Sequence, residues 1–462
     1  MIRKIEIKNF RSILKSTIDL QKLTVIVGAN ATGKSNLIKA VDFISDISDI
    51  GLQEAIYKRG GISEILPKQN TNIYDEEIEI KFEFEIEPPD FWLERELSPL
   101  VVSYELAFLK TKRNTIKITH ESISIKSILL LSYYLEKKLE DSIDKKIELE
   151  NDTVIELANS SITVVRNNKN DLNHTLNFNL SERNISYYIN WLGVKKFFND
   201  PSKKSLKNIQ ALTKELLNIQ KPGVRKSDLV ILSNNRAIFS FCIHFRQVLS
   251  EVQSYGRYDL LINELRQEQT ISSGERVSVT GDNLPSIIKR FAKDNKEEWS
   301  RIMSTMSNIS PYFDSVKSES LRAGKEYLVF TEVFKGRNIE SWESSDGTLR
   351  ALAILISVES HKVSSTVLIE EPEHGLHPWA VKELISHIKN VISTKHLQVI
   401  LTTHSQQVLE CIEENELLIT ERDESGTKYS TIKQLLPNSE ISMGEIGELW
   451  TRGLLKGVPV SW

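Results

Sequence analysis

The chain has few cysteines, few methionines and no long hydrophobic run. Its 462 residues include only two cysteines, Cys242 and Cys411, whose spacing suggests neither a disulfide framework nor a Cys-ligated metal site. No stretch approaches 18 consecutive apolar residues, and the first residues alternate like a strand without an apolar signal region. We therefore expect no membrane span and a cytoplasmic location.

Excess charge of either sign is also lacking. The formal net charge is -4, with 40% hydrophobic and 26% charged residues, which is typical of a soluble globular protein of two to three domains. This balance argues against a protein that coats nucleic acid with its whole surface, although a local basic face remains possible.

A complete nucleotide-binding loop follows an apolar strand near the N-terminus. Gly28, Gly33, Lys34 and Ser35 satisfy the pattern G-x-x-x-x-G-K-[ST], and a helical stretch follows at 36–43. Glycines let backbone N–H groups wrap phosphate oxygens, Lys34 neutralises the β- and γ-phosphates, and Ser35 offers a hydroxyl to Mg²⁺. We predict binding of ATP or GTP with Mg²⁺, through the residues Asn30, Ala31, Thr32, Gly33, Lys34, Ser35 and Asn36.

The pattern along the chain predicts an α/β protein with a split nucleotide-binding unit. Strands are expected at 78–86, 101–109, 115–125, 327–334, 366–369 and 398–402, and helices at 127–146, 237–254, 348–358 and 380–393. We therefore expect an N-terminal lobe at 1–125 with a β-rich part, a mostly helical insertion at 126–311, and a C-terminal lobe at 312–462.

Acidic residues follow the expected strand at 366–369. A buried parallel strand that ends in acids is where P-loop enzymes hold Mg²⁺ and activate water. Glu370 suits the magnesium side, although Asp is more usual there, and Glu371 suits the general base. The alternative is an acidic cluster that only complements a helix N-terminus.

A polar quartet, residues 402–405, follows the next expected strand. In a parallel sheet this position belongs to the ligand crevice, so His404 can hydrogen-bond the γ-phosphate and report its presence. A histidine that only caps the following helix is the alternative.

Two serine- and glycine-containing strings compete for a role as a second phosphate contact. Ser345, Asp346 and Gly347 open a helix, where they act either as a local N-cap or as an anion site for a partner's γ-phosphate. The similar string at 272–275 lies about 95 residues before the acidic strand, and we regard it as a decoy.

Two further features have more than one interpretation. His374 and His377 resemble a metal pair but lack helical i, i+4 spacing, so we prefer a turn that leads to a subunit interface. The window from Lys195 to Lys226 holds nine basic and two acidic residues. It is either a solvated surface or a patch that follows the phosphates of DNA or RNA.

These motifs, in this order, resemble ABC-type ATPases of the RecF, SMC and Rad-like branch. The opening segment 5–12, the P-loop, the signature-like Ser345-Asp346-Gly347, the acidic strand and His404 carry the resemblance. Segments 281–287, 370–378 and 447–453 are similar to bacterial AAA-family ATPases of anti-phage defence islands, and size and layout resemble the ATPase subunits of Septu systems.

The resemblance implies a split ABC-type P-loop head that acts as a dimer or higher oligomer. Lys34 and Ser35 of one protomer would hold ATP while Ser345 and Gly347 of another close the site. Arg11 would approach the nucleotide, Glu371 would act as base, and His404 would sense the γ-phosphate. Ser344 stands where Leu is common in the family, which affects packing more than phosphate contact.

Two functions remain open. The first is a regulatory ATPase that controls a separately encoded effector, a nuclease by expectation, in anti-phage defence, because the sequence has neither a late Toprim-like cluster of acids nor a Cys/His nuclease finger. The alternative is a DNA-repair or chromosome-maintenance ATPase that binds DNA through the region Lys195–Lys226. A transporter motor has no support in the sequence, and a scaffold that binds ATP without turnover is a further possibility.

Overall fold

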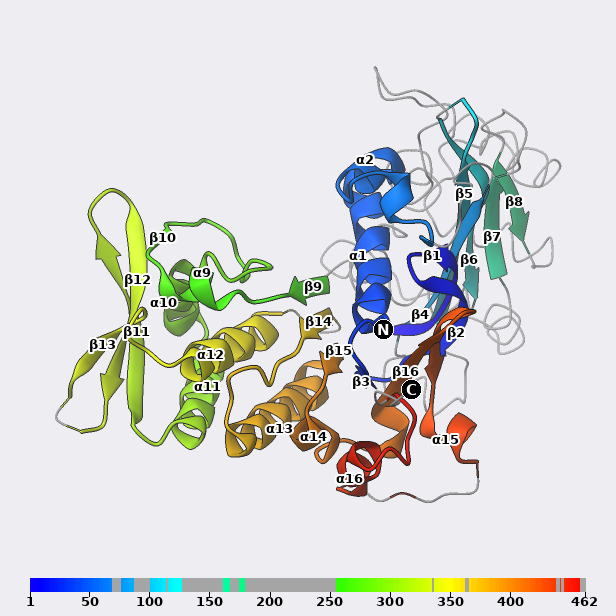
Figure 1. Ribbon diagram of the computed structural model, residues 1–462. Helices are drawn as coiled ribbons and strands as arrows, with labels where there is room; N and C mark the ends of the chain where they lie inside the picture. The colour runs from blue at the N-terminus through cyan, green and yellow to red at the C-terminus, as the bar shows by residue number, and fades with distance from the viewer. Residues whose placement is uncertain are drawn as a thin grey trace, which may run out of the picture. The chain divides into compact units, whose positions relative to one another are not determined.

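The described chain forms two compact units. The computed structural model describes residues 1–68, 76–86, 100–113, 115–126, 161–166, 174–178, 255–334, 336–361, 365–437, 441 and 444–457. The first unit, here called the P-loop unit, comprises Met1, Leu20–Lys39 and Ser254–Trp462. The second, the β unit, comprises Ile2–Asp19 and Ala40–Gln253. Figure 1 shows the elements of both.

A six-stranded sheet forms the centre of the P-loop unit. Its order is β17 (Gly426–Ser430), β16 (Leu417–Asp423), β3 (Leu23–Gly28), β15 (Gln398–Thr403), β14 (Thr366–Glu370) and β9 (Tyr255–Tyr258). All neighbours are parallel except β17, which is antiparallel to β16. Every residue of β3 and β15 is buried, as expected for strands with neighbours on both edges and covered faces. The carboxyl ends of β3, β15 and β14 meet at one edge.

Helices bury one another and the sheet. α1 (Lys34–Ile50) starts at the P-loop, and α10 (Leu284–Asp294), α11 (Lys296–Ile309), α12 (Asp346–Glu359) and α13 (Pro378–Lys395) form the largest packed group (Figure 1). α12 is buried along most of its length, with Leu352 and Leu355 fully buried, and each such leucine contributes about 2 kcal/mol of hydrophobic stabilisation. Short helices complete the unit: α9 (Ile262–Arg266), α14 (Gln406–Leu409), η4 (Glu414–Glu416), α15 (Ile432–Leu435) and α16 (Glu445–Thr451). In the described ranges, no helix has the length and apolarity needed to cross a bilayer.

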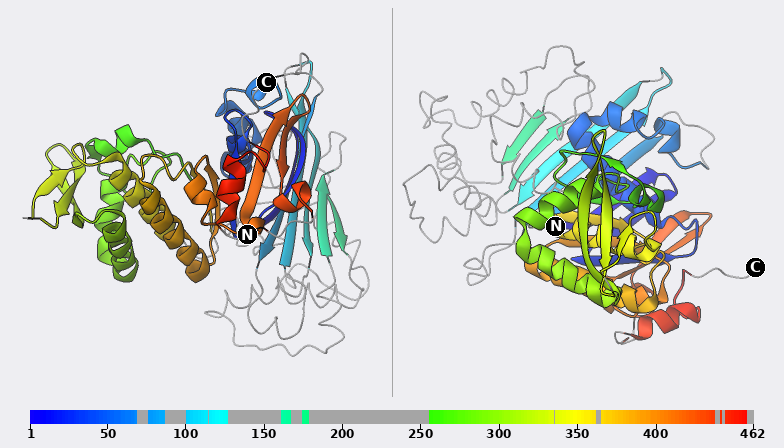
Figure 2. Two further views of the ribbon diagram at one scale, coloured as in Figure 1. Left: turned by 60° about the horizontal axis from the view of Figure 1, so that its bottom comes forward. Right: turned by 90° about the vertical axis from the view of Figure 1, so that its left-hand side faces the viewer.

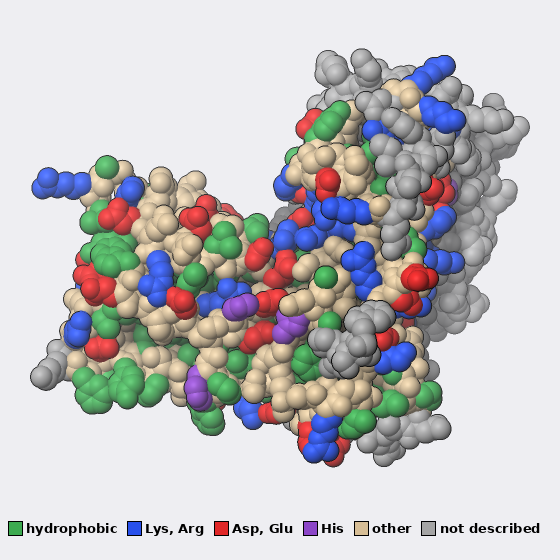
Figure 3. Space-filling view, viewed as in Figure 1, with side chains coloured by type: hydrophobic (Ala, Val, Ile, Leu, Met, Phe, Trp, Pro, Cys, Tyr) green, Lys and Arg blue, Asp and Glu red, His purple; other side chains and the backbone are tan. Residues whose placement is uncertain are grey.

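A small antiparallel sheet packs on the same helices. It consists of β10 (Gln269–Thr270), β12 (Lys325–Glu332), β11 (Phe313–Leu321) and, paired with β12, β13 (Asn338–Glu340). It lies beyond α10–α12, away from the parallel sheet of the same unit (Figure 2). Hydrophobic side chains reach the surface here (Figure 3), among them Tyr312 and Phe334, whose rings are 5.7 Å apart.

The β unit is built on a seven-stranded antiparallel sheet. Its order is β2 (Ile13–Asp19), β1 (Ile2–Phe10), β4 (Glu77–Ile86), β5 (Leu100–Lys110), β6 (Ile116–Lys126), β7 (Ser161–Arg166) and β8 (His174–Phe178). The unit also holds α2 (Leu52–Tyr57) and η1 (Ile62–Glu64). Alternation in 78–86 predicts a half-buried strand, and β4 confirms it, because Ile78, Ile80, Phe82 and Phe84 are all buried.

The expected boundary at 311/312 falls inside the P-loop unit. α10 and α11 lie before it, yet α11 packs against α12 and α13, so residues 255–311 belong with the C-terminal lobe. Strands β7 and β8 lie within the expected helical insertion and extend the antiparallel sheet. The helices expected at 127–146 and 237–254 lie outside the described residues, and the remainder of the three-way division stays a prediction.

Candidate nucleotide-binding site

The P-loop connects the central strand β3 to helix α1. Ala31 and Gly33 adopt positive φ angles of 64° and 108°, which turn the loop sharply before the helix begins at Lys34. Lys34 Nζ donates to the carbonyl oxygens of Gly28 at 2.9 Å and Ala29 at 3.1 Å, so the ammonium group closes over the loop. Burial lowers the pKa of Lys34, and the nearby carboxylates of Glu371 and Glu373 oppose that shift. Loops of this shape before a helix N-terminus are typical of anion-binding sites.

Side chains of the β16–β17 hairpin donate hydrogen bonds to carbonyl oxygens of the P-loop. Thr427 Oγ1 donates to the Thr32 carbonyl at 2.6 Å, and Tyr429 Oη donates to the Gly33 carbonyl at 2.9 Å. Burial raises the pKa of Tyr429, so its hydroxyl stays protonated and able to donate. These two bonds fix the loop through its carbonyls and use none of its N–H groups.

The first glycine of the motif is required by its neighbour on β16. A Cβ atom on Gly28 would lie 2.1 Å from Thr420 Oγ1 and 2.5 Å from the Thr420 carbonyl oxygen. Thr420 Oγ1 also donates to the Val27 carbonyl at 3.0 Å and lies 2.8 Å from Thr32 Oγ1. The motif therefore needs glycine at 28 because β16 passes directly behind it.

Glu370 ends β14 opposite Ser35 and accepts two bonds. Ser35 Oγ donates to Oε2 at 2.6 Å, and Arg257 Nη2 of β9 donates to Oε1 at 2.9 Å. A serine hydroxyl beside a carboxylate provides the hard oxygen donors that Mg²⁺ prefers, so these two side chains fit the ion. The sequence prediction did not include Arg257, whose charge lies on the same carboxylate.

Glu371 is held in an unusual backbone conformation. Its φ angle is +46°, a left-handed conformation that costs a non-glycine residue about 1–2 kcal/mol. Its amide donates to the Thr402 carbonyl at 3.0 Å. Two histidines flank its carboxylate: His374 Nδ1 lies 2.9 Å from Oε2, and His404 Nε2 lies 3.7 Å from Oε1. Backbone strain of this kind at the end of the acidic strand is typical of functional sites.

Glu373 fixes the segment that carries His404. Its Oε1 accepts from Thr403 Oγ1 at 2.7 Å and from the His404 amide at 2.8 Å. Burial lowers the pKa of His404, and the charge of Lys34 lowers it further, while Glu371 and Glu373 oppose this. The imidazole is therefore neutral at pH 7 and can serve as either donor or acceptor. Figure 3 shows acidic and histidine side chains gathered over the ends of β14 and β15.

The signature-like string begins helix α12. Ser345 is its N-cap, and Ser345 Oγ accepts from the Thr348 amide at 3.1 Å, so the local capping interpretation holds. Arg266 Nε donates to Asp346 Oδ1 at 2.9 Å, and Arg266 Nη1 donates to the Trp342 carbonyl at 2.7 Å. A Cβ atom on Gly347 would lie 2.5 Å from the Gly375 carbonyl oxygen. The string therefore packs against the turn that follows the acidic strand.

The other sequence candidates have different surroundings. The string at 272–275 starts no helix, and Arg290 holds it through the carbonyls of Ser272 and Gly274. His377 Nδ1 accepts from the Trp379 amide at 3.3 Å and caps α13, so its ring is used within the fold. Arg11, with a φ angle of 54°, belongs to the β unit, and its approach to the nucleotide stays a prediction. The region Lys195–Lys226 lies outside the described residues.

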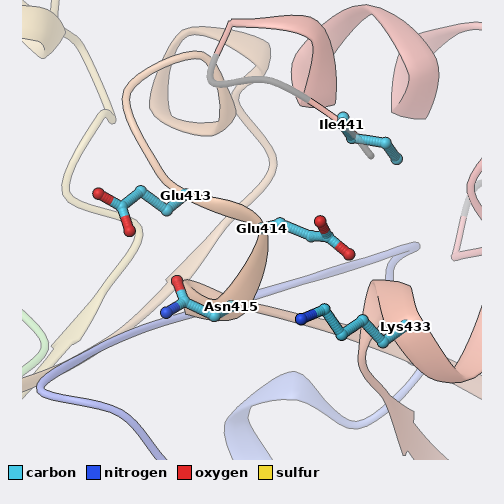
Figure 4. A pocket seen from close by; sticks show the side chains of 5 residues that line it. All are labelled: Glu413, Glu414, Asn415, Lys433 and Ile441. Atoms are coloured by element: carbon cyan, nitrogen blue, oxygen red, sulfur yellow. The ribbon is translucent and has the colours of Figure 1, made fainter. Parts of the chain in front are cut away.

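A cavity of about 290 Å³ lies elsewhere in the P-loop unit. Figure 4 shows its lining, which consists of Glu413, Glu414, Asn415, Lys433 and Ile441. None of these side chains belongs to the P-loop, the acidic strand or the signature-like string. This cavity is therefore separate from the candidate site.

The solved structures that match this chain include SMC head domains. One from Pyrococcus furiosus, with an extended coiled coil and bound to the C-terminal domain of ScpA, is 14% identical, with a TM-score of 0.41 over 94% of this chain and 98% of that one. One from Thermotoga maritima is 13% identical, with a TM-score of 0.39 over 93% and 98%. One from Pyrococcus yayanosii, with a coiled coil and joint, is 14% identical, with a TM-score of 0.42 over 98% and 99%.

Comparison of the sequence with protein families identifies the family of this chain. No curated protein matches the chain significantly. A family of AAA domains matches residues 23–410, a range that includes most of the P-loop unit with its P-loop, acidic strand and His404. The chain therefore belongs to the ATPase family described as "AAA domain, putative AbiEii toxin, Type IV TA system".

Proposed function

We propose that this chain hydrolyses ATP and uses its nucleotide state to control a separately encoded effector in anti-phage defence. The observation that carries the ATPase part is the contact between Ser35 and Glu370 at 2.6 Å, with Glu371 next in the chain and Lys34 next to Ser35. This contact joins the phosphate-binding loop to the acidic strand at one edge of the sheet. The measurement that tests it is release of phosphate from ATP by the purified chain.

Ser35 and Glu370 would hold Mg²⁺ when MgATP binds. The bound ion would supply positive charge that stabilises the developing negative charge on the phosphoryl oxygens. The Lys34 ammonium group would bind the β- and γ-phosphates after leaving the carbonyl oxygens of Gly28 and Ala29.

Glu371 would act as the general base. Its carboxylate has other neighbours than that of Glu370, which Ser35 and Arg257 contact. That arrangement leaves Glu371 to orient an attacking water molecule, with His374 and His404 on either side. His404, fixed through its amide by Glu373, would contact the γ-phosphate.

A second copy of the chain would complete the site. Ser345 caps α12 in an exposed position, and the first turn of that helix offers backbone N–H groups and a favourable dipole to an anion. We infer that Ser345, Asp346 and Gly347 of one protomer close on the ATP held by the other. Sedimentation with ATP bound to a Glu371→Gln variant tests this dimer.

The defence role is supported by the sequence resemblance and by the description of the matched family. Size and motif order resemble those of the PtuA subunit of Septu systems, whose layout fits an ATPase that works with a separate effector. Expression of the gene with and without its chromosomal neighbours, followed by phage challenge, tests this role. Protection that depends on Lys34 and on a neighbouring gene supports it, whereas protection by the ATPase alone contradicts it.

The alternative function, a RecF- or SMC-like ATPase that binds DNA, is favoured by the nine basic residues between Lys195 and Lys226. Neutralisation of phosphates by lysine makes affinity fall steeply with salt. Replacement of Lys203, Lys204 and Lys207 by Glu should then weaken DNA binding and flatten its salt dependence. An unchanged slope removes the support for this alternative.

A further inference from the structure

A partly buried arginine of α12 binds the backbone of the acidic strand. Arg350 Nη2 donates to the carbonyl oxygens of Glu370 at 3.1 Å and Glu371 at 3.0 Å. Arg350 Nη1 donates to the Leu260 carbonyl at 2.9 Å. Burial lowers the pKa of Arg350 while Glu373, Asp259 and Glu371 oppose the shift, and a guanidinium group stays charged under such conditions.

These bonds act on a residue of the site that has a positive φ angle. Glu371 has a φ angle of +46°, and its amide is held by the Thr402 carbonyl at 3.0 Å. Arg350 holds the carbonyl of the same residue, so hydrogen bonds fix the backbone on both sides of its Cα atom. Arg350 binds three carbonyl oxygens, those of Glu370, Glu371 and Leu260. A planar guanidinium group has several N–H donors with fixed directions and can make all three bonds, whereas the ammonium group of a lysine acts as one point charge.

The helix that carries Arg350 also begins with the signature-like string. Ser345 caps α12, and Gly347 packs so closely on the turn after Glu373 that a Cβ atom there would lie 2.5 Å from the Gly375 carbonyl oxygen. Helix α12 therefore touches the acidic segment twice, through Gly347 and through Arg350. A shift of the first turns of α12 must move the backbone of Glu371 or break these contacts.

We propose that Arg350 is a positioning residue that couples the signature-like turn of a protomer to its own Glu371. The inference rests on the proposed function, in which that turn closes the partner's ATP site. Closure at one site of the dimer then acts through α12 and Arg350 on the base of the other site. The two sites hydrolyse ATP cooperatively as a result.

The first experiment measures ATP hydrolysis against ATP concentration for the full chain and its Arg350→Lys variant. The wild type should give a Hill coefficient near 2. The variant should give a coefficient near 1 and a kcat roughly 10- to 100-fold lower. Its affinity for a fluorescent ATP analogue should change less than about threefold, because Arg350 bonds to no P-loop residue.

Arg301→Lys is the matched control. Arg301 of α11 contacts the opposite end of the same helix, where its Nε donates to Glu359 Oε1 at 3.1 Å. Arg301→Lys therefore also removes a guanidinium group that contacts α12. Its contact lies at the end of the helix that is far from the signature-like string. This control should retain the wild-type Hill coefficient and kcat.

Mixed dimers with one active base distinguish coupling from a general loss of structure. Arg350→Lys should slow hydrolysis when it lies in the chain that retains Glu371, with Glu371→Gln in the other chain. It should have no effect when it lies in the chain that carries Glu371→Gln. Equal effects in both arrangements would overturn the proposal, as would a wild-type dimer with a Hill coefficient of 1 or a variant with unchanged cooperativity. A wild type that stays monomeric with ATP instead contradicts the proposed dimeric site.

Discussion

Ser35 Oγ and Glu370 Oε2 lie 2.6 Å apart although 335 positions separate the two residues in the chain. The sheet order explains this contact, because β15 alone lies between β3 and β14 and all three strands run parallel. The loop after β3 and the acids at the end of β14 therefore reach the same edge.

Removal of Arg257 should strengthen binding of a divalent cation in the absence of nucleotide. Its guanidinium group lies 2.9 Å from Glu370 Oε1, where its positive charge opposes a second cation. We expect Arg257→Met to raise the affinity for Mn²⁺ alone by about tenfold, measured by electron paramagnetic resonance. Arg301→Met is the control, and equal affinities for the wild type and Arg257→Met would contradict this assignment.

Removal of the proposed base should separate binding from turnover. Glu371→Gln keeps the shape of the side chain but cannot accept a proton, so kcat should fall by about 10²- to 10⁴-fold while ATP affinity stays within a factor of a few. Phosphate release and nucleotide titration measure the two effects. Glu383→Gln on the surface of α13 is the control, and wild-type turnover by Glu371→Gln would show that another group is the base.

Loss of one hydroxyl behind the P-loop should weaken ATP binding. Tyr429→Phe leaves the Gly33 carbonyl without its 2.9 Å bond, which corresponds to about 1 kcal/mol, or a fivefold weaker affinity for ATP. Tyr327→Phe is the control, because the Tyr327 hydroxyl donates only to the surface residue Glu319 at 3.2 Å. Identical ATP affinities for the two variants would mean that the hairpin does not preorganise the loop.

A methyl group on Gly347 of the signature-like string should disrupt the contact between this glycine and the turn at Gly375, which follows the acidic strand. In Gly347→Ala the new Cβ atom meets the Gly375 carbonyl oxygen at 2.5 Å, so α12 or the turn must shift. We expect at least tenfold slower hydrolysis and weaker ATP-dependent dimerisation. Gly274→Ala, in the competing string, meets its nearest atom at 3.3 Å and should behave like the wild type. The reverse result would make the string at 272–275 the functional one.

Acid should destabilise the P-loop unit through a buried histidine. Burial lowers the pKa of His361 to about 3, with further lowering by Arg276 and Lys395, and its Nε2 lies 2.8 Å from the Tyr258 hydroxyl. Because the folded-state pKa lies below the ordinary value, the stabilisation is complete above pH 6.5 and is lost as the pH falls toward 3.

Urea unfolding at two pH values tests this effect. Between pH 7 and pH 5 the histidine accounts for a loss of about 2 kcal/mol in the free energy of unfolding. His361→Gln should remove that part of the pH dependence, whereas His120→Gln, at a partly exposed side chain, should not. An unchanged pH slope for His361→Gln would mean that the pKa of His361 does not differ between the folded and unfolded states.

Local patterns predicted the parts of the site that lie within one segment. The P-loop, the acidic end of β14 and the capped start of α12 each depend on residue type and spacing over a few positions. Arg257, Arg350 and Tyr429 could not be found that way, because β9, α12 and β17 meet the site only through the order of the sheet and the packing of helices. The packing of α11 onto α12 and α13 depends on the same long-range order, and the local pattern around 311/312 does not reveal it.

The hairpin that supports the P-loop is synthesised long after the loop itself. Tyr429 and Gly33 are 396 positions apart, so a nascent chain exposes its phosphate-binding loop early but gains the support of that loop only when residue 430 has left the ribosome. Unfinished chains therefore lack the hydrogen bond that fixes the Gly33 carbonyl. The order of the strands delays this support of the loop until nearly the whole described chain has been made.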